Sequence, residues 1–436
     1  MISDLLTNST NPLELLFSLH RFGIRPGLDR TLRLAEFAGN PHLTFPTIHV
    51  AGTNGKGSVT SMIASILVEA GYKTGLYTSP HLIRFNERIR IDGKQIPDEK
   101  IIEYTQKLLP ETLSIGGTFF EITTVMAFKW FAECNADIAI IETGLGGRFD
   151  STNIIKPLVS IITNIDFDHK EYLGDTLQEI AFEKAGIIKP NTPVIISDKN
   201  NITAPVFNKK ANECDSKIIY ISDYYRGEII NSNPGLSQTC NISTPDKSYK
   251  DLKLELAGNH QLNNLLTAIA ALDLIKKDFH IEENQVRKGF HNIRKNTGIR
   301  ARIELIRDTP PLIIDVAHNP DSFSRLFETI KQCGYMDKKW SLVFAVMEDK
   351  DIENILSIIK PDIEHLIITK PKIDRAASTG KISEIARNKG YQNIIVYPDV
   401  EEAVRFTIDS KNPTIIAGSF YLIGEALQVL SEYFEI

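Results

Sequence analysis

From Pro46 onward, short β-branched runs alternate with longer segments of helical period along most of this chain. This alternation is expected when parallel strands are joined by crossover helices, so it predicts an α/β architecture. The clearest unit is a strand at 47–50, a glycine-rich turn, and a helix over 56–70 whose apolar residues recur at i, i+3, i+4 and i+7. Further strands are predicted at 74–77, 138–141, 159–163 and 194–197.

The length of 436 residues predicts two or three globular modules rather than one. A second series of strands, each followed by a helical segment, begins after residue 302 and indicates a separate Rossmann-like domain. The polar segment at 294–298 could serve as a hinge, so we predict domains at 1–295 and 296–436. Residues 214–252 are poor in helical period and predict irregular or antiparallel structure at the edge of the first domain. The second-series strands are expected at 312–316, 341–345, 365–369, 393–397 and 414–417.

Charge and apolar patterning exclude two classes of partner. Lysine and arginine number 49 against 55 acidic residues, a formal charge of -6, which removes the bulk electrostatic argument for binding nucleic acid. The apolar runs are strand-sized and too short to span a membrane. The first residues carry no basic side chain before their apolar part, unlike a signal peptide. The four cysteines lack CxxC spacing, so we predict a cytoplasmic protein with reduced cysteines.

A glycine-rich turn separates the first strand from its helix. At such a place backbone amides and the positive helix end favour an anion, and Lys56 adds a point charge. The spacing departs from the strict phosphate-loop string because Gly57 intervenes between Lys56 and Ser58. We predict a phosphate cradle, with a ligand-free turn as the alternative. The cradle consists of Gly52, Thr53, Asn54, Gly55, Lys56, Gly57 and Ser58.

Two neighbouring strands end in groups that could hold a metal ion beside this turn. Ser58 could place a hydroxyl on a magnesium ion between phosphates, and magnesium also prefers carboxylate oxygen. Glu142 ends one predicted strand, and His169 follows the next. Open α/β sheets bind ligands at such strand ends. The alternatives are a turn-capping Glu142 and a structural His169, and on charge alone Lys184 is an ordinary solvated helix residue.

Eight segments in order make the chain resemble one known family. They run from about residue 19 to 425 and are similar to folylpolyglutamate synthase and dihydrofolate synthase, within the Mur ligase superfamily. The segments are HVAGTNGKGSV, TSPHLIRFNERIRI, TFFEITT, IETGLGGRFDSTN, DHKEYLGDTLQEIAFEKAGIIK, GNHQLNN, IDVAHNPDS and GSFYLIGE.

The resemblance implies an ATP-dependent amide ligase with a phosphate-loop, Mur-ligase-like domain and a C-terminal Rossmann-like domain. In such an enzyme ATP phosphorylates a carboxylate, and the amino group of L-glutamate displaces the phosphate from the acyl phosphate. The resemblance places the ATP site and a folate-binding loop in 1–295, and implies that 296–436 closes over ATP and glutamate. It also implies two Mg²⁺ ions and a monomer.

The resemblance also implies roles for metal-binding residues. Ser58 and Glu142 resemble ligands of one magnesium ion, and Glu142 and His169 resemble ligands of the second. Lys184 matches a lysine that carbon dioxide carbamylates, which turns a cation into an anionic oxygen ligand. Lys56, Glu142, His169 and Lys184 would therefore carry the catalysis.

The substrate-binding residues follow from the same resemblance. Phe120 and Asp150 resemble the pocket that stacks on and hydrogen-bonds the pterin ring, although Phe119 or Phe120 could equally be a core residue. Asp315 and His318 resemble contacts to ribose and phosphate, the alternative being that they cap the following helix. Further nucleotide contacts are expected from Asn264 and Arg302, and the folate loop from Ser79, His81 and Arg84.

The motifs are compatible with three functions. The leading one is dihydrofolate synthase activity, folylpolyglutamate synthase activity, or both. A Mur-type cell-wall ligase is disfavoured because the 51 residues before Gly52 are too few for the substrate-binding domain that such enzymes carry there. A phosphate-loop ATPase switch would need neither the SPHLIRF loop nor Lys184. The expected partners are small molecules: dihydropteroate or folate, L-glutamate and ATP.

Overall fold

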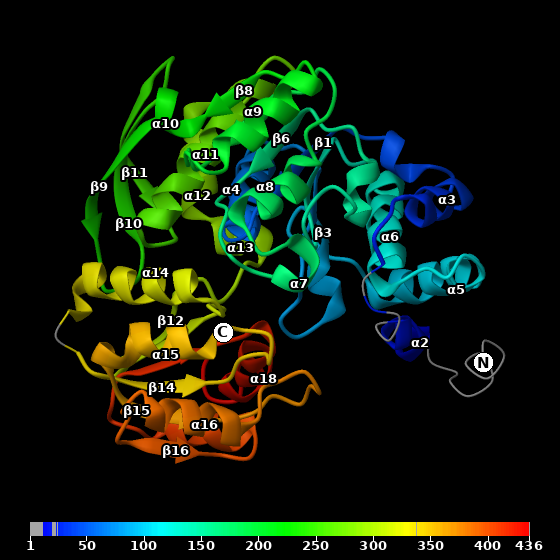
Figure 1. Cartoon of the computed structure of the whole chain (residues 1–436). Coiled ribbons are helices and arrows are strands. Elements are labelled where there is room, and N and C mark those ends of the chain that lie inside the picture. The colour runs from blue at the N-terminus through cyan, green and yellow to red at the C-terminus, as the bar shows by residue number, and fades with distance from the viewer. Residues whose placement is uncertain (1–11, 20–22, 24, 337, 436) are drawn as a thin grey trace. The chain divides into compact units, whose positions relative to one another are not determined.

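The computed structural model describes residues 12–19, 23, 25–336 and 338–435 (Figure 1). It divides into two compact units. Unit 1 consists of the described residues up to Ser79, Phe85–Arg226 and Asn264–Gly298, and unit 2 of Pro80–Arg84, Gly227–Asn263 and the described residues from Ile299. The prediction of no signal peptide rests on residues that lie partly outside the described ones. Both units are α/β, as predicted.

Unit 1 is built on an eight-stranded sheet of order β4-β3-β2-β5-β1-β6-β7-β8. From β2 to β8 neighbouring strands are parallel, and only the β2–β3 and β3–β4 pairs are antiparallel. The predicted strands are confirmed to within one residue at each end, whereas β3, β4 and β8 have two or three residues each and gave no pattern to recognise. The strands are β1 (Thr47–Ala51), β2 (Thr74–Tyr77), β3 (Ile89–Ile91), β4 (Lys94–Gln95), β5 (Ile138–Glu142), β6 (Val159–Ile162), β7 (Val194–Ile196) and β8 (Ile218–Tyr220).

Helix α4 follows β1 and is buried on nearly all sides, because α12, α13 and the sheet all pack against it. Helices α3, α5 and α6 group together beside the sheet (Figure 1) around an aromatic core. The helices of this unit are α2 (Pro12–Ser18), α3 (Asp29–Phe37), α4 (Lys56–Glu69), α5 (Asp98–Ser114), α6 (Phe119–Glu133), α7 (Lys170–Leu173), α8 (Leu177–Ala185), α9 (Ala204–Glu213), α10 (Ile221–Tyr224), α12 (Glu283–His291) and α13 (Ile293–Thr297), with α11 (Asn259–Ile275) entering from unit 2.

Unit 2 is built on a six-stranded sheet of order β12-β13-β17-β14-β15-β16, parallel except for the β12–β13 pair. Apolar clusters cover both faces of this sheet. The predicted strands are again confirmed with small shifts of their ends. The elements are β12 (Glu304–Asp308), β13 (Pro311–Asp315), β14 (Trp340–Phe344), β15 (Ile363–Ile368), β16 (Ile394–Val396), β17 (Thr414–Ala417), α14 (Pro320–Ile330), α15 (Ile352–Ile359), α16 (Thr379–Asn388), α17 (Val400–Ile408) and α18 (Phe420–Leu430).

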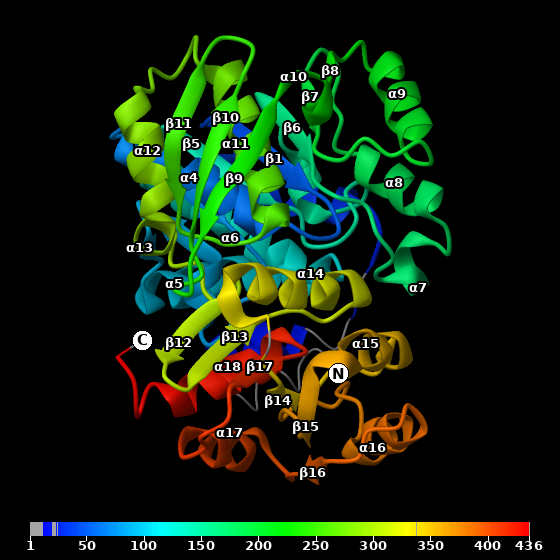
Figure 2. The same cartoon turned by 90° about the vertical axis from the view of Figure 1, so that its left-hand side faces the viewer.

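The segment 227–263 lies in a different domain from the one predicted. It contains nearly all of a three-stranded antiparallel sheet, whose strands are β9 (Arg226–Ser232), β10 (Gln238–Ser243) and β11 (Ser248–Leu254). The antiparallel structure was expected, but this segment belongs to unit 2 rather than to the first domain. The reason is packing: Leu236 and Ala257 are buried in the same cluster as Phe323 of α14, and Figure 2 shows the end of this sheet beside that helix. Sequence periodicity could not reveal which domain covers these apolar residues.

The helices give no sign of a membrane-spanning segment. Within the described ranges, none combines the length and the apolar character needed to cross a bilayer.

Candidate functional site

The glycine-rich turn connects β1 to α4 in a conformation that requires glycine at two positions. Gly52 has a φ of 151°, and a Cβ there would lie 1.7 Å from Oγ1 of Thr163. Gly55 has a φ of 89° at the N-cap of α4, and a Cβ there would lie 2.7 Å from Oδ1 of Asn264. These φ values and close approaches exclude larger residues. The predicted nucleotide residue Asn264 therefore lies directly against the loop.

Residues that follow β6 hold the loop in shape. The backbone amide of Asn54 donates to Oδ1 of Asn164 at 2.7 Å, and that of Thr53 donates to the carbonyl oxygen of Asn164 at 2.8 Å. The hydroxyl of Thr163 donates to the carbonyl oxygen of Asn54 at 2.7 Å. Sequence reasoning missed Thr163 and Asn164. Their position directly after the strand beside β1 was the available signal, because the carboxyl ends of parallel strands meet at one edge of a sheet.

Two lysines meet at the carbonyl oxygen of Gly52. Nζ of Lys56 donates to it at 3.0 Å and to the carbonyl oxygen of Thr53 at 3.1 Å. Nζ of Lys184, from the distant helix α8, donates to the same Gly52 oxygen at 2.7 Å. Lys184 is only 3% exposed. The structure thus brings together two lysines predicted from different segments.

Burial and the charge of Lys56 lower the pKa of Lys184 to about 7, although the carboxylates of Asp168 and Asp150 oppose this shift. A lysine that loses its proton near neutral pH supplies the neutral amine needed for nucleophilic chemistry. The expectation from charge alone, that Lys184 is a solvated helix residue, is wrong because the side chain points into the unit.

Glu142 and Ser58 lie in the positions expected of them. Glu142 ends β5, is paired in register with Val50 of β1, and is 4% exposed. Its Oε2 accepts the backbone N–H of Ser79 at 3.1 Å. Ser58 lies in the first turn of α4 and is 3% exposed. Two buried oxygen groups that could bind a metal ion therefore lie at the end of β5 and at the start of α4.

His169 lies in a different setting. It is the N-cap residue of α7, with a φ of 50°, and its exposed ring has Nε2 3.7 Å from Oδ2 of Asp168. Among the residues that the structure describes, no group of three or more His, Cys, Asp or Glu side chains forms a cluster that could hold a metal ion. This absence does not test the predicted ligand set, because that set also includes a serine, Ser58, and a lysine, Lys184. The ligand set therefore stays a prediction.

The two residues predicted to bind the pterin ring flank one loop. The ring of Phe120 lies against Gly144, where an added Cβ would be 2.4 Å away. Oδ2 of Asp150 accepts the backbone N–H of Leu145 at 2.8 Å. Burial raises the pKa of Asp150, while hydrogen bonds from its neighbours oppose that rise. Phe119 is 4% exposed in the aromatic core, so the structural alternative holds for that residue, and the partly buried Phe120 packs against the same core.

The predicted folate loop belongs to both units. Ser79 lies in unit 1, where it contacts Glu142 as described above. His81 and Arg84 lie in the segment that belongs to unit 2. There Leu82 packs against an apolar cluster, and its carbonyl oxygen approaches Gly424 of α18 so closely that a Cβ would be 2.0 Å from it.

Within unit 2 the predicted nucleotide residues gather around one ring. The guanidinium carbon of Arg302 lies 5.6 Å from the ring centre of Phe420, and the ring of His318 lies 6.1 Å from it. Asp315 accepts the backbone N–H groups of Ile303 and Ala317, each at 2.7 Å, and burial raises its pKa to about 6. Sequence reasoning missed Phe420, which lies in the GSFYLIGE segment at the start of α18.

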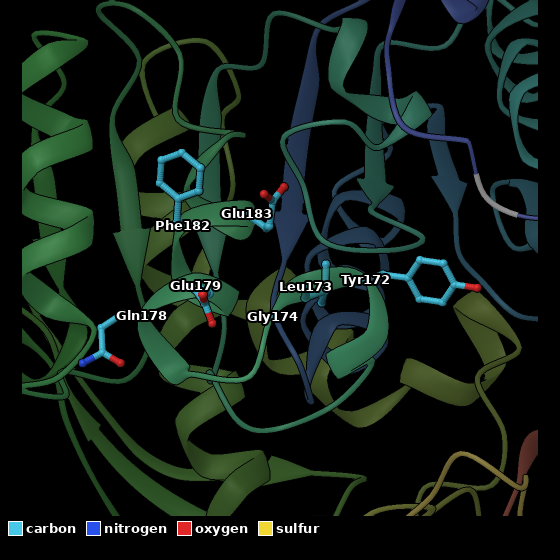
Figure 3. Close-up of a pocket in the computed structure, with 7 residues that line it drawn as sticks. All are labelled: Tyr172, Leu173, Gly174, Gln178, Glu179, Phe182 and Glu183. Carbon is cyan, nitrogen blue, oxygen red and sulfur yellow. The ribbon is translucent and has the colours of Figure 1, made fainter.

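A pocket of about 400 Å³ lies elsewhere, on α7 and α8 (Figure 3). Its lining contains none of the predicted site residues, and the side chains of Tyr172, Gln178 and Phe182 point away from one another. This pocket therefore lacks the convergent polar groups that are typical of a ligand site.

Comparison with known proteins defines the class. Residues 50–272 match the Mur ligase middle domain, and residues 301–419 match the glutamate ligase domain of Mur ligases. Dihydrofolate synthase/folylpolyglutamate synthase of Bacillus subtilis is 35% identical, over 93% of this chain and 95% of the relative. Folylpolyglutamate synthase of Lacticaseibacillus casei is 30% identical, over 97% of this chain and 99% of the relative.

Solved structures agree. Folylpolyglutamate synthase from Thermotoga maritima is 32% identical with a TM-score of 0.84 and covers 96% of both chains. E. coli FolC in complex with DHPP and ADP is 27% identical with a TM-score of 0.86, over 97% of this chain and 98% of that one. The chain therefore belongs to the dihydrofolate synthase/folylpolyglutamate synthase family of Mur ligases and is an ATP-dependent ligase, as the sequence predicted.

Proposed function

We propose that this enzyme joins L-glutamate to dihydropteroate, to folates, or to both, through an acyl phosphate. The observation that carries the proposal is the convergence of Lys56 and Lys184 on the Gly52 carbonyl oxygen, with Lys184 buried and within electrostatic reach of Asp168 and Asp150. A free carboxylate is a poor electrophile because its leaving group would be oxide, so it must first be phosphorylated. The Lys56 cation and the backbone amides at a helix start suit the negative charge that spreads over the transferred phosphoryl group.

The residues near the loop fit magnesium. The hydroxyl of Ser58, in the first turn of α4, and the carboxylate of Glu142, at the carboxyl end of β5, are hard oxygen ligands, and both residues are nearly buried. We propose that Ser58 and Glu142 hold one ion, and that Glu142, His169 and a carbamylated Lys184 hold a second. The lowered pKa of Lys184 supports this, because carbon dioxide reacts with the neutral amine. Bound Mg²⁺ would supply charge stabilisation for the transferred phosphoryl group.

The other substrate contacts are proposals of the same kind. Lys56 and the loop amides would bind the phosphates of ATP, and the further nucleotide contacts proposed from the family resemblance are Asn264, Arg302, Asp315 and His318. An aromatic face and a carboxylate suit a flat, donor-rich pterin edge. The pterin substrate would meet Ser79, His81, Arg84, Phe120 and Asp150.

The names of two relatives support proposing both the dihydrofolate synthase and the folylpolyglutamate synthase activity. The Bacillus subtilis protein carries both names, and the Lacticaseibacillus casei protein carries only that of the folate-extending activity. We further propose that the enzyme is a cytoplasmic monomer, on the strength of its family resemblance.

The coupling of ATP cleavage to both co-substrates tests the function. Phosphate release from ATP is expected only when L-glutamate and either dihydropteroate or tetrahydrofolate are both present, because the acyl phosphate needs an acceptor amine. The measurement is inorganic phosphate per minute with each substrate omitted in turn. Running the two pterins in parallel assigns one activity or both. Equal release with neither substrate would contradict the proposal and favour an ATPase switch.

A further inference from the structure

A chain of three buried polar side chains leads from the middle of the unit 1 sheet to Asp150. His49 lies on β1, and its Nε2 is 2.8 Å from Oγ1 of Thr152. The hydroxyl of Thr152 donates to Oδ1 of Asp150 at 2.5 Å, and its backbone N–H donates to the same oxygen at 3.0 Å. His49 and Thr152 are 0% exposed and Asp150 is 6% exposed. Neither His49 nor Thr152 has a role in the function proposed above.

The direction of these hydrogen bonds follows from counting protons. Thr152 has one hydroxyl proton, and because it is donated to Asp150 the hydroxyl oxygen can only accept from His49. Burial lowers the pKa of His49 to about 3, so the imidazole is neutral and carries one proton. That proton must be on Nε2. Nδ1 of His49 has no hydrogen-bond partner among the described residues, in agreement with a nitrogen that carries only a lone pair.

The opposite arrangement is less favourable. If the proton were on Nδ1, the hydroxyl of Thr152 would have to donate to Nε2, and Asp150 would lose its side-chain donor. A buried N–H without an acceptor would also be left on His49, which is costly. The chain His49 to Thr152 to Asp150 therefore has one favoured direction, and it ends on a carboxylate oxygen that only accepts.

The carboxylate at the end of this chain also controls the loop that faces Phe120. Oδ1 of Asp150 is fixed by Thr152, while Oδ2 accepts the N–H of Leu145 at 2.8 Å. A rotation of the carboxylate would therefore move the Gly144–Leu145 backbone, against which the ring of Phe120 is packed.

We infer that His49 is a positioning residue for recognition of the pterin ring: through Thr152 it holds Asp150, and with it the Gly144–Leu145 loop, in the orientation that accepts a planar, donor-rich heterocycle. This inference rests on the proposed function. It explains why a histidine occupies a fully buried position in a strand otherwise made of small or apolar residues, where an apolar side chain would avoid burying a polar group.

Two pairs of variants test the inference. His49→Gln keeps an N–H donor, whereas His49→Leu removes it; Thr152→Ser keeps the hydroxyl, whereas Thr152→Val removes it at nearly the same volume. We expect His49→Leu and Thr152→Val each to raise KM for dihydropteroate by about tenfold or more, as expected when a charged group loses a hydrogen bond. KM for ATP should change by less than about twofold, and the Gln and Ser variants should recover most of the loss. The Thr152 pair keeps the test decisive if His49→Leu does not fold.

The double variant and histidine NMR complete the test. Because both substitutions break one chain, His49→Leu with Thr152→Val should raise KM no further than either alone. Nitrogen-15 spectra of the wild-type histidines, with His49 assigned through His49→Gln, should show a neutral Nε2–H tautomer that does not titrate between pH 5 and pH 8.

The contradicting results are distinct from a failure of the proposed function. If the wild-type enzyme turns over normally and His49→Leu and Thr152→Val both keep the wild-type KM for dihydropteroate, this inference alone is overturned. An equal rise in KM for ATP, or an Nδ1–H tautomer of His49, would also overturn it. A wild-type enzyme that turns over neither dihydropteroate nor folate would instead overturn the proposed function.

Discussion

Lys56→Ala is expected to lower glutamate-dependent phosphate release by at least about 100-fold, the loss typical when one preorganised donor to a developing charge is removed. Nζ of Lys56 lies 3.0 Å and 3.1 Å from two carbonyl oxygens of its own loop, so its charge is held at the loop that we propose binds the phosphates. If Lys56 binds the phosphates as proposed, removing this cation would leave the phosphoryl charge without that counterion. The measurement is kcat/KM for ATP with dihydropteroate and glutamate saturating.

The control for Lys56→Ala is Lys209→Ala. Lys209 is exposed on α9, and its replacement by alanine removes one positive charge from a different segment of the chain. The activity of Lys209→Ala should therefore match that of the wild type. Thermal unfolding of both variants checks that the fold is intact. A folded Lys56→Ala protein that keeps more than a tenth of the wild-type rate would contradict a phosphate-binding role for this lysine.

Lys184→Ala is expected to lower the ligase rate by about 100-fold or more, because loss of even an outer-shell partner of a metal ligand typically costs about 10–100-fold. The rate should be partly restored by short carboxylic acids such as formate and acetate. Lys184 is buried, so its truncation leaves a space into which a small carboxylate can bring an oxygen ligand. An amine could not be replaced in this way, so rescue reports on the carbamate. The measurement is the ligase rate as a function of acetate concentration.

Lys56→Ala is the matched control for this rescue. Like Lys184, Lys56 donates to the carbonyl oxygen of Gly52. A carboxylate cannot replace the positive charge of Lys56, so acetate should not restore the activity of Lys56→Ala. If neither formate nor acetate raises the rate of Lys184→Ala, the carbamate assignment is contradicted while the ligase function stands.

The glycine-rich turn was predictable because its requirements are local. Gly52 and Gly55 adopt positive φ values at a strand–helix connection, and such positions select glycine and leave a pattern in the sequence. The strands were predictable for the same reason, since a buried parallel strand is a short apolar run.

The rest of the site depends on packing between distant segments. Lys184 meets Gly52 across 132 residues and His49 meets Thr152 across 103, and neither approach leaves a periodic signal. The family resemblance supplied a role for Lys184 but none for His49, Thr152 or Phe420. The assignment of 227–263 to unit 2 likewise depends on which apolar cluster covers that sheet.

The central claim is that the substrate carboxylate is phosphorylated before the amide forms. Dihydropteroate labelled with oxygen-18 in its carboxylate tests this directly when it reacts with ATP and L-glutamate. In the acyl phosphate, one carboxylate oxygen bridges carbon and phosphorus, and the amine of glutamate then displaces it with the phosphate. Mass spectrometry should find one oxygen-18 in each inorganic phosphate that accompanies amide formation, and phosphate without label would contradict the mechanism.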